Sequence, residues 1–538
     1  MSEDLRDIPS LDAFLNAALR EGVLSGAQVD ATGVNIPTVQ GLLRVPLAGR
    51  ATFRWRFRQG LSLAERPCTI GEALTLLARP FGAIFAARIE DSSAAIRRAP
   101  GMLSQDDPAR WNFQEAEAAM RHGHPCHPNP RSRDGMSVAE ARRFAPEFGA
   151  GFALTWLEVP RSRVTASANA LPRLARLAAA DGAPGRAAPE MIRLPIHPWQ
   201  AGVEAARIAD AGARILGPGR GEWRATASMR TLHGWHADVM LKMSLSLRLT
   251  NSTRVLQPRE MRRGADLARL LDGPVGRDLR ARFAHMHILR EADHAALSDG
   301  AGMIAQTLVS LRDNPFRDPR TRGPVMLGSL CEPPPGERSA LARLIGLGDA
   351  RGWFRQFLRT AILPLLEVRA THGLLFGAHQ QNMMIGLDAV RAPRSVWLRD
   401  CQGSGHIDSF HDRLARHCPD LGRDAGNTVT AELGDVLLTY YVVVNGVMHL
   451  LSTLALDGLA DEVALLDDWR DFLTAARRDS RGESVLYDKL LDGEALPCKG
   501  NFETSRLGLN EADGGADGQL ARFLTLPNPL STLQRNPA

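Results

Sequence analysis

The stretch LKMSLSLRLT, Leu241–Thr250, alternates apolar and polar side chains without exception. Strict period-2 alternation over this length predicts a β-strand with one buried face. The polar face then carries hydrogen-bond donors ~6.6 Å apart, which is two strand rises of ~3.3 Å each. Upstream, Ala225–Leu232 repeats the pattern, and Leu232–Asp238 is short enough to turn the chain. The two strands are therefore expected to pair as a hairpin.

The polar face of this predicted hairpin carries cations and hydroxyl groups and no acid. Its members are Ser228, Arg230, Lys242, Arg248 and Thr250, with Arg254 just beyond the strand end. Such a face suits a polyanion such as ATP or citrate. A solvated amphipathic sheet is the alternative, since charged side chains are ordinary on an exposed face. Lys242 favours the site, because the 65 basic residues include three lysines, Lys242, Lys489 and Lys499, and a surface position here would be expected to carry Arg.

A second cluster of polar residues occupies the loop His122–Arg133, HGHPCHPNPRSR. Three His within six residues could bind a metal. However, Arg131 and Arg133 follow, the prolines extend the loop, and no carboxylate appears before Asp134. Guanidinium groups that bind phosphate oxygens, with the histidines as additional donors, fit this composition better than a cation site. A purely structural loop is the alternative.

A third cluster begins at His379–Asn382 and continues through an apolar piece, Met383–Ile385, to a second piece that ends at Asp400. An Asn and an Asp eighteen residues apart, each at the end of a short strand-like segment, could hold Mg²⁺ beside nucleotide phosphates. Kinase-like phosphotransferases use this logic, but the usual catalytic Asp ahead of the Asn is missing. The chain has no Walker A, G-x-G-x-x-G, G-x-S-x-G or H-E-x-x-H motif.

Length and composition are those of an ordinary soluble protein. The chain has 538 residues, of which 44% are hydrophobic and 23% charged, and its length predicts three or four packed units. Disordered, collagen-like and small disulfide-rich classes are excluded. The net charge of +5, spread over 65 basic and 60 acidic residues, does not indicate a nucleic-acid or membrane partner. The six cysteines form no C-x-x-C pair and the N-terminus has no apolar signal core, so a cytoplasmic protein is predicted.

One segment, Val436–Leu456, has 21 residues without a charge and could span a bilayer by length. Asn445 and His449 lie inside it, Asp435 and Asp457 bracket it, and no second span accompanies it. We therefore expect a helix buried in a large core.

Taken in order, four motifs resemble those of the siderophore synthetases that work independently of peptide-synthetase assembly lines, the aerobactin-synthetase or IucA/IucC-like family. They are Gly123–Arg133, Ile196–Gln200 (IHPWQ), Lys242–Arg254, and Ala378–Asn382 with Arg399-Asp400. The resemblance implies an α+β, multi-domain cupped hand of thumb, fingers and palm, with an antiparallel sheet in the fingers and a mostly helical palm. The implied units are residues 1–118 (thumb), 119–330 (fingers) and 331–538 (palm).

The resemblance also implies the reaction. ATP adenylates a carboxylate of citrate or of a citrate derivative with loss of pyrophosphate, and an amine, hydroxylamine or alcohol then displaces AMP. The implied ATP ligands are His127, Arg131, Arg133, Ser228, Arg230, Asn382 and Asp400, of which Asn382 and Asp400 would also hold Mg²⁺. The implied carboxylate ligands are Lys242, Thr250, Arg254, His379 and Gln381, with Lys242, Arg254 and His379 as catalytic residues. Lys499 is a weaker further candidate, and a homodimer is expected from the resemblance alone.

This chain departs from the family pattern at three positions. Arg131 stands where Lys is usual, and Gly377 and Gln402 stand where acids are common. Fewer carboxylates are therefore available for Mg²⁺. A kinase-like phosphotransferase and an anion- or nucleotide-binding protein without turnover stay open as alternatives. The sequence does not identify the nucleophile, nor whether the acceptor is free or monosubstituted citrate.

Overall fold

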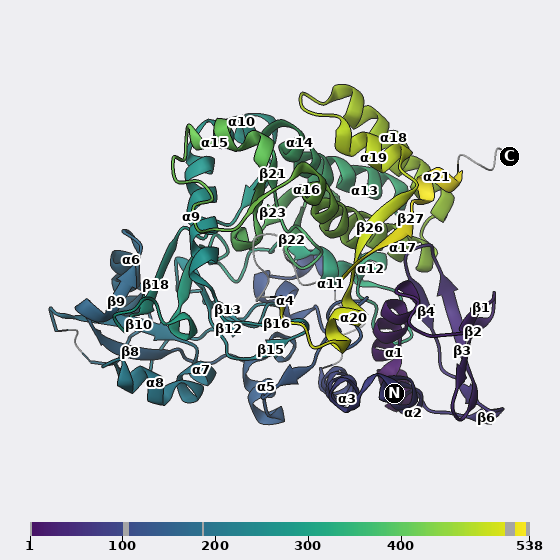
Figure 1. Cartoon of the computed structure of the whole chain (residues 1–538), viewed down its shortest axis with the longest axis horizontal. Coiled ribbons are helices and arrows are strands. Elements are labelled where there is room, and N and C mark those ends of the chain that lie inside the picture. Colours follow the sequence, from purple (N-terminus) through teal and green to yellow (C-terminus); the bar gives the residue numbers. More distant parts are fainter. Residues whose placement is uncertain (1–2, 101–106, 186–187, 512–521, 534–538) are drawn as a thin grey trace.

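The computed structural model describes residues 3–100, 107–185, 188–511 and 522–533. The elements form an N-terminal unit, a lobe of sheets and a helical unit, and the sheet lobe and the N-terminal unit lie at opposite ends of the long axis (Figure 1). Helices are mixed with antiparallel sheets, which confirms the predicted α+β multi-domain fold. The largest apolar core contains side chains from all three predicted ranges, so the boundaries at residues 118 and 330 stay a prediction.

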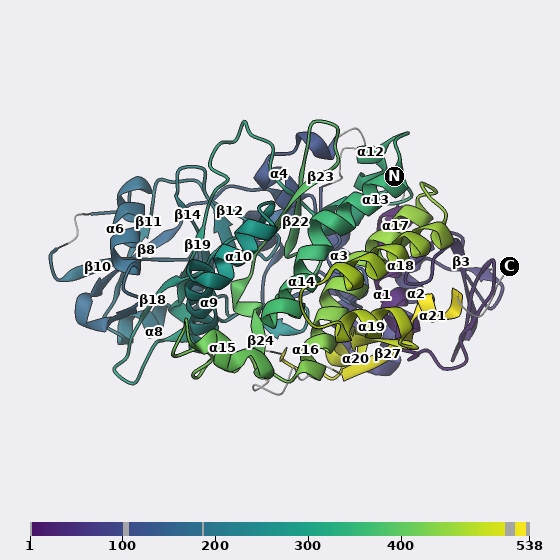
Figure 2. The ribbon, with the colours of Figure 1, turned by 90° about the horizontal axis from the view of Figure 1, so that it is seen from above.

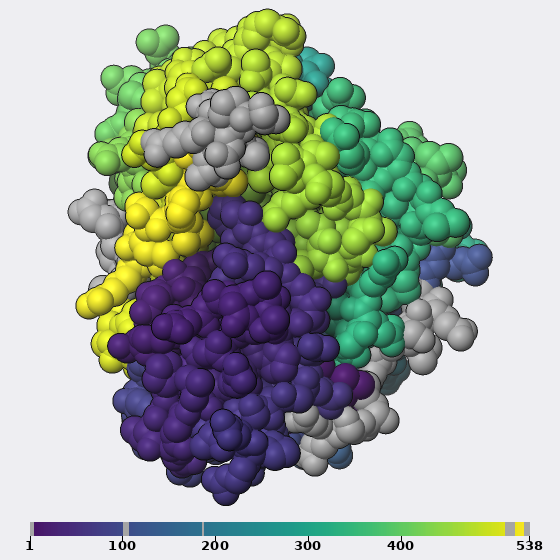
Figure 3. Space-filling model, turned by 90° about the vertical axis from the view of Figure 1, so that its right-hand side faces the viewer, coloured from purple at the N-terminus to yellow at the C-terminus, as the bar shows by residue number. Residues whose placement is uncertain are grey.

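The N-terminal unit packs three helices against a small sheet. Leu11, Phe14 and Leu15 of its first helix are fully buried on one face. Phe502, from the end of the chain, packs edge-on against Phe14 with 5.5 Å between ring centroids, and Figure 3 shows this unit in purple beside the yellow C-terminal part. Its elements are α1 (Glu3–Arg20), β1 (Gln28–Val29), β2 (Gly33–Thr38), β3 (Gly41–Arg50), β4 (Trp55–Phe57), β5 (Ser62–Leu63), β6 (Arg66–Pro67), α2 (Ile70–Ala78) and α3 (Ala83–Arg98).

The sheet lobe is built on a six-stranded antiparallel sheet of order β12-β13-β14-β19-β18-β9, with a three-stranded sheet of order β10-β8-β11 beside it. Asp181 is fully buried in this lobe and accepts hydrogen bonds from Trp156 and Trp223, at 2.7 and 2.6 Å. The elements are β7 (Arg133–Asp134), α5 (Val138–Phe144), β8 (Thr155–Pro160), β9 (Val164–Ala166), α6 (Ala170–Ala180), β10 (Met191–Ile196), α7 (Pro198–Val203), α8 (Ala205–Asp210), β11 (Arg214–Pro218), β12 (Arg224–Ala225), β13 (Thr231–His233), β14 (Val239–Met243), β15 (Arg248–Leu249), β16 (Ser252–Thr253), β18 (Asp293–Leu297) and β19 (Val309–Asp313).

The predicted hairpin is confirmed, because β13 pairs antiparallel with β14 and places Thr231 opposite Lys242. The predicted ten-residue strand is wrong in its second half, since β14 ends and a loop precedes β15. Ser244 Oγ donates to Ala305 O at 2.6 Å and accepts from the Leu256 N–H at 2.9 Å. These side-chain bonds to distant backbone hold the loop in place of a sheet ladder.

The alternative of a solvated amphipathic sheet is wrong, because both faces of β14 are buried. The exposed fraction of Lys242 is 2% and that of Ser244 is 1%. The upstream segment Ala225–Leu232 is not one strand either, since Met229 takes a left-handed φ of 66° in the turn between β12 and β13. The polar residues of this hairpin therefore face the interior of the protein.

The helical unit surrounds a sheet of order β17-β23-β22-β20. Seen from above, α9 and α10 lie between the sheet lobe and the later helices (Figure 2). The elements are α4 (Phe113–Ala118), α9 (Pro258–Asp272), α10 (Pro274–Arg282), β17 (Met286–Ile288), β20 (Val325–Met326), α11 (Leu327–Cys331), α12 (Ala340–Ile345), α13 (Ala350–Phe357), α14 (Leu363–His372), β21 (Leu374–Leu375), β22 (Met383–Leu387), β23 (Pro393–Leu398), β24 (Gly405–Ile407), α15 (His411–Ala415), β25 (Thr428–Val429), α16 (Ala431–Leu438), α17 (His449–Leu456), α18 (Glu462–Asp479), α19 (Val485–Asp492), β26 (Ala495–Gly500), α20 (Asn501–Arg506), β27 (Arg522–Pro527) and α21 (Pro529–Leu533).

The apolar segment noted in the sequence lies within one long helix, Ala431–Leu456, whose mean hydropathy and length would suffice to cross a membrane. In the structure, 83% of its apolar window is buried inside the protein, as expected of a core helix. Between α16 and α17 the helix is π-helical, over Thr439–Met448. Such wide turns are frequent at functional sites, and this one places Tyr440, Tyr441 and Asn445 on the wall of the cavity described below.

The motif Ile196–Gln200 fastens the loop that follows β14. Gln200 accepts from the Ser246 N–H at 2.7 Å and donates to Ser246 Oγ at 3.0 Å. His197 is fully buried at the start of α7, where its Nδ1 accepts from the Trp199 N–H at 3.1 Å. Burial lowers the pKa of His197 to about 3, so the ring is neutral at pH 7.

This ring should make stability depend on pH. Because its pKa is lowered on folding, the contribution of His197 to stability is complete above the ordinary pKa of 6.5 and is lost as the pH falls toward about 3. At about 1.4 kcal/mol per pH unit, acidification from pH 6.5 to about 5 costs about 2 kcal/mol. His197→Asn keeps an acceptor for the Trp199 N–H but has no ring to protonate. We therefore expect this variant to lose about 2 kcal/mol less unfolding free energy than the unmodified protein when the pH falls from 7 to 5. Urea-unfolding midpoints of both proteins measure this, and equal shifts would contradict it.

Candidate active site

A single cavity of about 260 Å³ brings the predicted site residues together. It lies where three parts of the chain meet: the hairpin of β13 and β14, the loop His122–Arg133, which we call the His-Pro loop, and the ends of β22 and β23. All twelve residues predicted to bind ATP or the carboxylate line it, and so does Lys499. The twelve are His127, Arg131, Arg133, Ser228, Arg230, Lys242, Thr250, Arg254, His379, Gln381, Asn382 and Asp400. Which ligand each residue binds stays a prediction.

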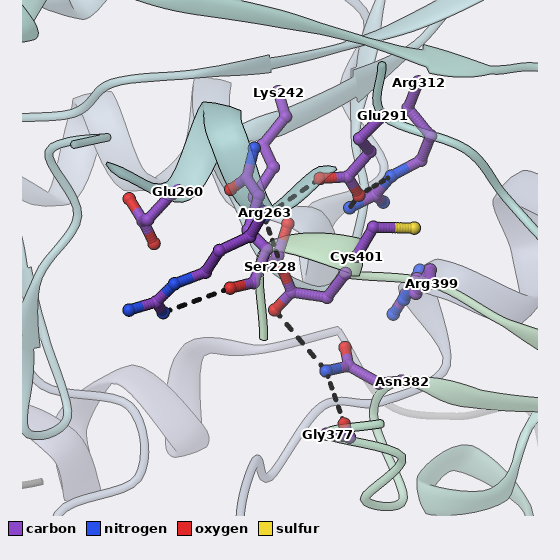
Figure 4. Close-up of polar contacts among 12 residues, drawn as sticks. Ser228, Lys242, Glu260, Arg263, Glu291, Arg312, Gly377, Asn382, Arg399 and Cys401 are labelled. Carbon is purple, nitrogen blue, oxygen red and sulfur yellow. Dashed lines mark hydrogen bonds and ion pairs between the residues drawn. The ribbon is translucent and has the colours of Figure 1, made fainter. Parts of the chain in front are cut away.

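Lys242 forms the centre of a buried charge network (Figure 4). Its Nζ donates to Asp400 Oδ1 and lies 3.4 Å from Glu291 Oε2. Glu291 also accepts from Arg312, at 2.7 Å from Nε and 2.6 Å from Nη2. Burial acts to raise the pKa of Asp400, but Lys242 and the neighbouring arginines outweigh it and hold that pKa well below its usual range. Asp400 is therefore an anion whose position is set from β14.

The turn that carries Asp400 has an unusual backbone. Asp400 adopts a left-handed φ of 69°, which Asp tolerates better than most residues other than Gly. Arg399 holds the turn, because its guanidinium pairs with the buried Glu117 and donates from Nε to Gln381 O at 3.0 Å. Asn382 Nδ2 lies 3.5 Å from Asp400 Oδ2. The Asn and the Asp that the sequence places eighteen residues apart are thus neighbours in the cavity.

Two guanidinium groups, those of Arg230 and Arg254, lie side by side at the cavity wall. Arg230 Nη1 donates to Arg254 O at 3.2 Å, and Arg254 Nη2 donates to Thr250 Oγ1 at 3.0 Å. Burial, and next the charge of Arg230, lower the pKa of Arg254 to about 10, so it is still a cation at pH 7. The two acids that most stabilise its charge, Glu511 and Asp400, already pair with lysines. An anionic ligand would therefore supply the negative charge that this pair lacks.

Two of the three histidines that line the cavity, His127 and His379, are neutral hydrogen-bonding groups at pH 7. Burial lowers the pKa of His127 and that of His379 to about 4 each. His127 Nδ1 accepts from the Asn129 N–H at 3.2 Å, so its Nε2 carries the proton and donates to Asn251 Oδ1 at 2.9 Å. His379 Nδ1 accepts from the Gln381 N–H at 3.2 Å, so its Nε2 carries the proton, and this Nε2 lies 3.2 Å from the side-chain amide nitrogen of Asn382.

The two arginines of the His-Pro loop are already engaged by protein groups. Arg133 pairs with Glu147, and Arg131 Nη1 lies 3.8 Å from the same carboxylate. Arg131 Nε also donates to Arg121 O at 2.8 Å. Glu147 is 3% exposed, so this cluster is buried. Phosphate binding by Arg131 and Arg133 stays a prediction, and it requires the two groups to share their hydrogen bonds with a ligand.

The three histidines of the loop have separate partners. His122 lies 3.4 Å from Glu332, His124 Nδ1 accepts from the Cys126 N–H at 3.1 Å, and His127 binds Asn251 as described. Within the described ranges, no group of three or more His, Cys, Asp or Glu side chains is placed to hold a metal ion. A histidine metal centre is therefore not supported in this loop.

Family comparisons agree with this geometry. The model of the IucA / IucC family matches residues 112–332, and that of the ferric iron reductase FhuF-like transporter family matches residues 351–516. The rhizobactin siderophore biosynthesis protein RhbC of Rhizobium meliloti is 32% identical over an alignment of 445 residues, which covers 78% of this chain and 75% of that protein. This chain belongs to the IucA/IucC family.

Further IucA/IucC-family relatives align over most of the chain. The N(2)-citryl-N(6)-acetyl-N(6)-hydroxylysine synthase of Vibrio mimicus is 29% identical over 84% of this chain and 80% of its own length. The ATP-bound structure of aerobactin synthetase IucA from Klebsiella pneumoniae has a TM-score of 0.85 with 27% identity, covering 97% of this chain and 99% of that one. The petrobactin biosynthesis protein AsbB of Bacillus anthracis, at 16% identity and a TM-score of 0.80 over 99% of this chain and 97% of that one, shares the fold.

The structure adds residues to this IucA/IucC-family site that the sequence did not single out. Glu291, just before β18, and Arg312 of β19 support Lys242. Arg312 belongs to the polar face of an alternating strand, a signal that could have found it. Lys499 pairs with Glu511 at 2.6 Å, so residues 499–511 close one side of the cavity. Arg248, which the alternation places in the polar row, instead donates to Leu509 O at 2.9 Å and ties this segment to β15.

Proposed function

We propose that this protein is an ATP-dependent ligase of siderophore biosynthesis. It adenylates a carboxylate of citrate or of a citrate derivative and condenses it with an amine, a hydroxylamine or an alcohol. The observation that carries the proposal is the pair of the buried Arg230 and the half-buried Arg254, two cations without a carboxylate partner of their own, beside the Lys242–Asp400 pair. The relatives named above act in siderophore biosynthesis, and one is named as a citryl synthase.

The proposed reaction has two steps. A carboxylate oxygen attacks the α-phosphorus of ATP, the bond to the β-phosphate oxygen breaks, and pyrophosphate leaves with that electron pair. The nucleophile then attacks the acyl carbon, loses a proton, and AMP leaves with the former carboxylate oxygen. Both steps build negative charge beside an existing anion, so fixed cations lower both barriers.

The cavity residues suit these steps. Arg254 and the neutral His379 can donate to the carboxylate, and Arg230 with Ser228 can donate to the phosphates from the same wall. Because Lys242 is 2% exposed and bonded to Asp400, we assign it a positioning role in addition to its charge. It keeps Asp400 ionised and directed toward the nucleotide side.

Mg²⁺ is the cofactor that this proposal adds to ATP. Asp400 and Asn382 offer one carboxylate and one amide oxygen donor, which fits a cation that takes its remaining ligands from phosphates and water. When bound, Mg²⁺ neutralises phosphate charge. The missing acid at Gly377 is not a matter of space, since a Cβ there would meet Gly403 O at an ordinary 3.5 Å. Gln402 is 1% exposed, with its Oε1 lacking a partner among the residues described.

The expected dimer follows from the resemblance alone. We propose a cytoplasmic homodimer that has small-molecule partners and neither nucleic acid nor membrane as a partner. Light scattering of the purified chain gives the mass directly, and a monomer at micromolar concentration would contradict the dimer.

Product analysis tests the reaction. The full chain is incubated with Mg-ATP, citrate and a panel of amines, hydroxylamines and alcohols, and the nucleotide and phosphate products are followed. We expect AMP and pyrophosphate in equal amounts, dependent on citrate. ADP with a phosphorylated acceptor would instead establish the kinase-like alternative. Saturable citrate binding without any nucleotide turnover would establish a binding protein.

A further inference from the structure

A second and larger cavity, of about 520 Å³, lies between the N-terminal unit and the helical unit. We call it the N-terminal cavity. Ile8 and Ala13 of α1, Pro334 and Leu456 give it apolar walls, and Arg54 lies at its buried side. None of the twelve predicted site residues lines it. It therefore lies outside the set of residues predicted to bind ATP or the carboxylate.

Two arginines bring unused hydrogen-bond donors to this cavity. Arg54 is 6% exposed, its Nη1 donates to Cys331 O at 3.2 Å, and its Nε has no partner among the described residues. Arg56 pairs through Nη1 with Asp457 at 2.6 Å, while its Nε and Nη2 are buried and without partners in the same part of the chain. A buried guanidinium with unmet donors is costly unless something else completes it.

The buried acids of the cavity are engaged elsewhere. Asp12 accepts from the Phe57 N–H at 2.9 Å, and Glu332 accepts from the His122 N–H at 3.0 Å. Burial raises the pKa of Asp12 to about 6, which makes it a weak counter-charge. Within the described part of the chain, Arg54 thus lacks a carboxylate that it could hold in a paired, fork-like contact.

Two residues, Gly123 and Gln380, line both this cavity and the catalytic one, and of the two Gln380 carries a polar side chain. Gln380 lines both cavities and is 2% exposed, and neither its Oε1 nor its Nε2 has a partner among the residues that the structure describes. It stands between His379 and Gln381, which both belong to the catalytic cavity. A ligand that contacts the Gln380 amide would therefore sit one side chain away from the reacting groups.

We propose that the N-terminal cavity binds a small molecule with a carboxylate on a short alkyl part, held by Arg54, Arg56 and the amide of Gln380. The guanidinium forks match a carboxylate, and the apolar walls match an alkyl chain. This inference rests on the proposed function, which involves two kinds of molecule with a carboxylate on a short alkyl part: an amino-acid nucleophile and a second citrate. The site itself does not depend on turnover, so it is tested without ATP.

The test is titration calorimetry of the full chain with four probes: citrate, L-lysine, cadaverine, which is lysine without its carboxylate, and inorganic phosphate. Arg56→Lys keeps a cation for Asp457 and removes the two unpartnered N–H groups. We expect it to weaken binding of a carboxylate probe about tenfold. Gln380→Leu, which breaks no side-chain hydrogen bond among the residues that the structure describes, should weaken binding of the same probe. Arg44→Lys, an exposed position on β3, is the matched control and should change nothing.

The probes distinguish the two sources. An amino-acid nucleophile predicts binding of L-lysine that cadaverine does not share. A second citrate predicts two citrate sites per chain in the unmodified protein and one in Arg56→Lys, while Arg254→Ala removes the other. The proposal is overturned if Arg56→Lys and Gln380→Leu, both folded by circular dichroism, leave all carboxylate isotherms unchanged. Absence of any carboxylate binding, or binding of phosphate alone, also overturns it, whether or not the protein makes AMP.

Discussion

Replacing Lys242 with Met is expected to lower citrate-dependent pyrophosphate release at least about 100-fold. The substitution keeps the length of the side chain and removes the charge that joins Asp400 to Glu291. Removing one partner of a buried ion pair costs about 3–5 kcal/mol, because the remaining charges are left without compensation. Asp400 would lose its ionisation or its position, and either change removes it from the nucleotide. Initial rates of pyrophosphate release measure the effect.

Lys489→Met is the matched control for this experiment. Lys489 carries the same change on a half-exposed side chain, and its partner Asp435 keeps a second ion pair, to Arg369 at 2.7 Å. We expect Lys489→Met to retain normal turnover. Lys242→Arg should lose about tenfold, since a forked guanidinium does not fit a site built around one buried ammonium. Normal turnover in Lys242→Met would remove Lys242 from the site.

Replacing Arg254 with Ala is expected to raise the KM for citrate about 100-fold and to change the KM for ATP much less. The Arg254 side chain is half-buried beside Arg230 and donates to Thr250, and a hydrogen bond to a charged group contributes about 1.5–3 kcal/mol. Loss of one such bond to the carboxylate, at about 2.7 kcal/mol, corresponds to the expected factor. Steady-state kinetics with each substrate varied in turn separates the two constants.

Arg262→Ala controls for loss of a guanidinium from the same region. Arg262 lies on α9 with half of its side chain exposed, and it pairs only loosely with Asp424, at 3.5 Å. We expect wild-type kinetics from this variant. If Arg254→Ala instead raises the KM for ATP and leaves that for citrate unchanged, Arg254 is a nucleotide ligand and the two predicted roles must be exchanged.

The part of the site that could be predicted lies in short local strings. The alternation around Leu241 and Leu245 correctly places both side chains in the core, because period-2 spacing is a local property of the chain. The strand break at Ser244 could not be predicted, since its bonds reach Ala305 and Leu256. Long-range hydrogen bonds of this kind leave no trace in the spacing of apolar residues.

The network behind Lys242 shows the same limit. The rarity of Lys in an Arg-rich chain singles out Lys242, and a buried ammonium between two carboxylates explains why Arg is absent there. Glu291, however, is an isolated acid in the sequence, and only folding brings it to Lys242 and Arg312. The segment around Glu511, which closes one side of the cavity, also lies far along the chain from Lys242. Of its residues, the sequence singled out Lys499, which pairs with Glu511.

Transfer of oxygen from citrate to AMP tests the central claim most directly. Citrate labelled with ¹⁸O in its carboxylates is incubated with the full chain, Mg-ATP and an accepted amine, and the AMP is analysed by mass spectrometry. Adenylation predicts one ¹⁸O atom in the phosphate of each AMP, because the carboxylate oxygen that attacks phosphorus leaves with it. AMP without the label, or label appearing in inorganic phosphate beside ADP, would contradict the account.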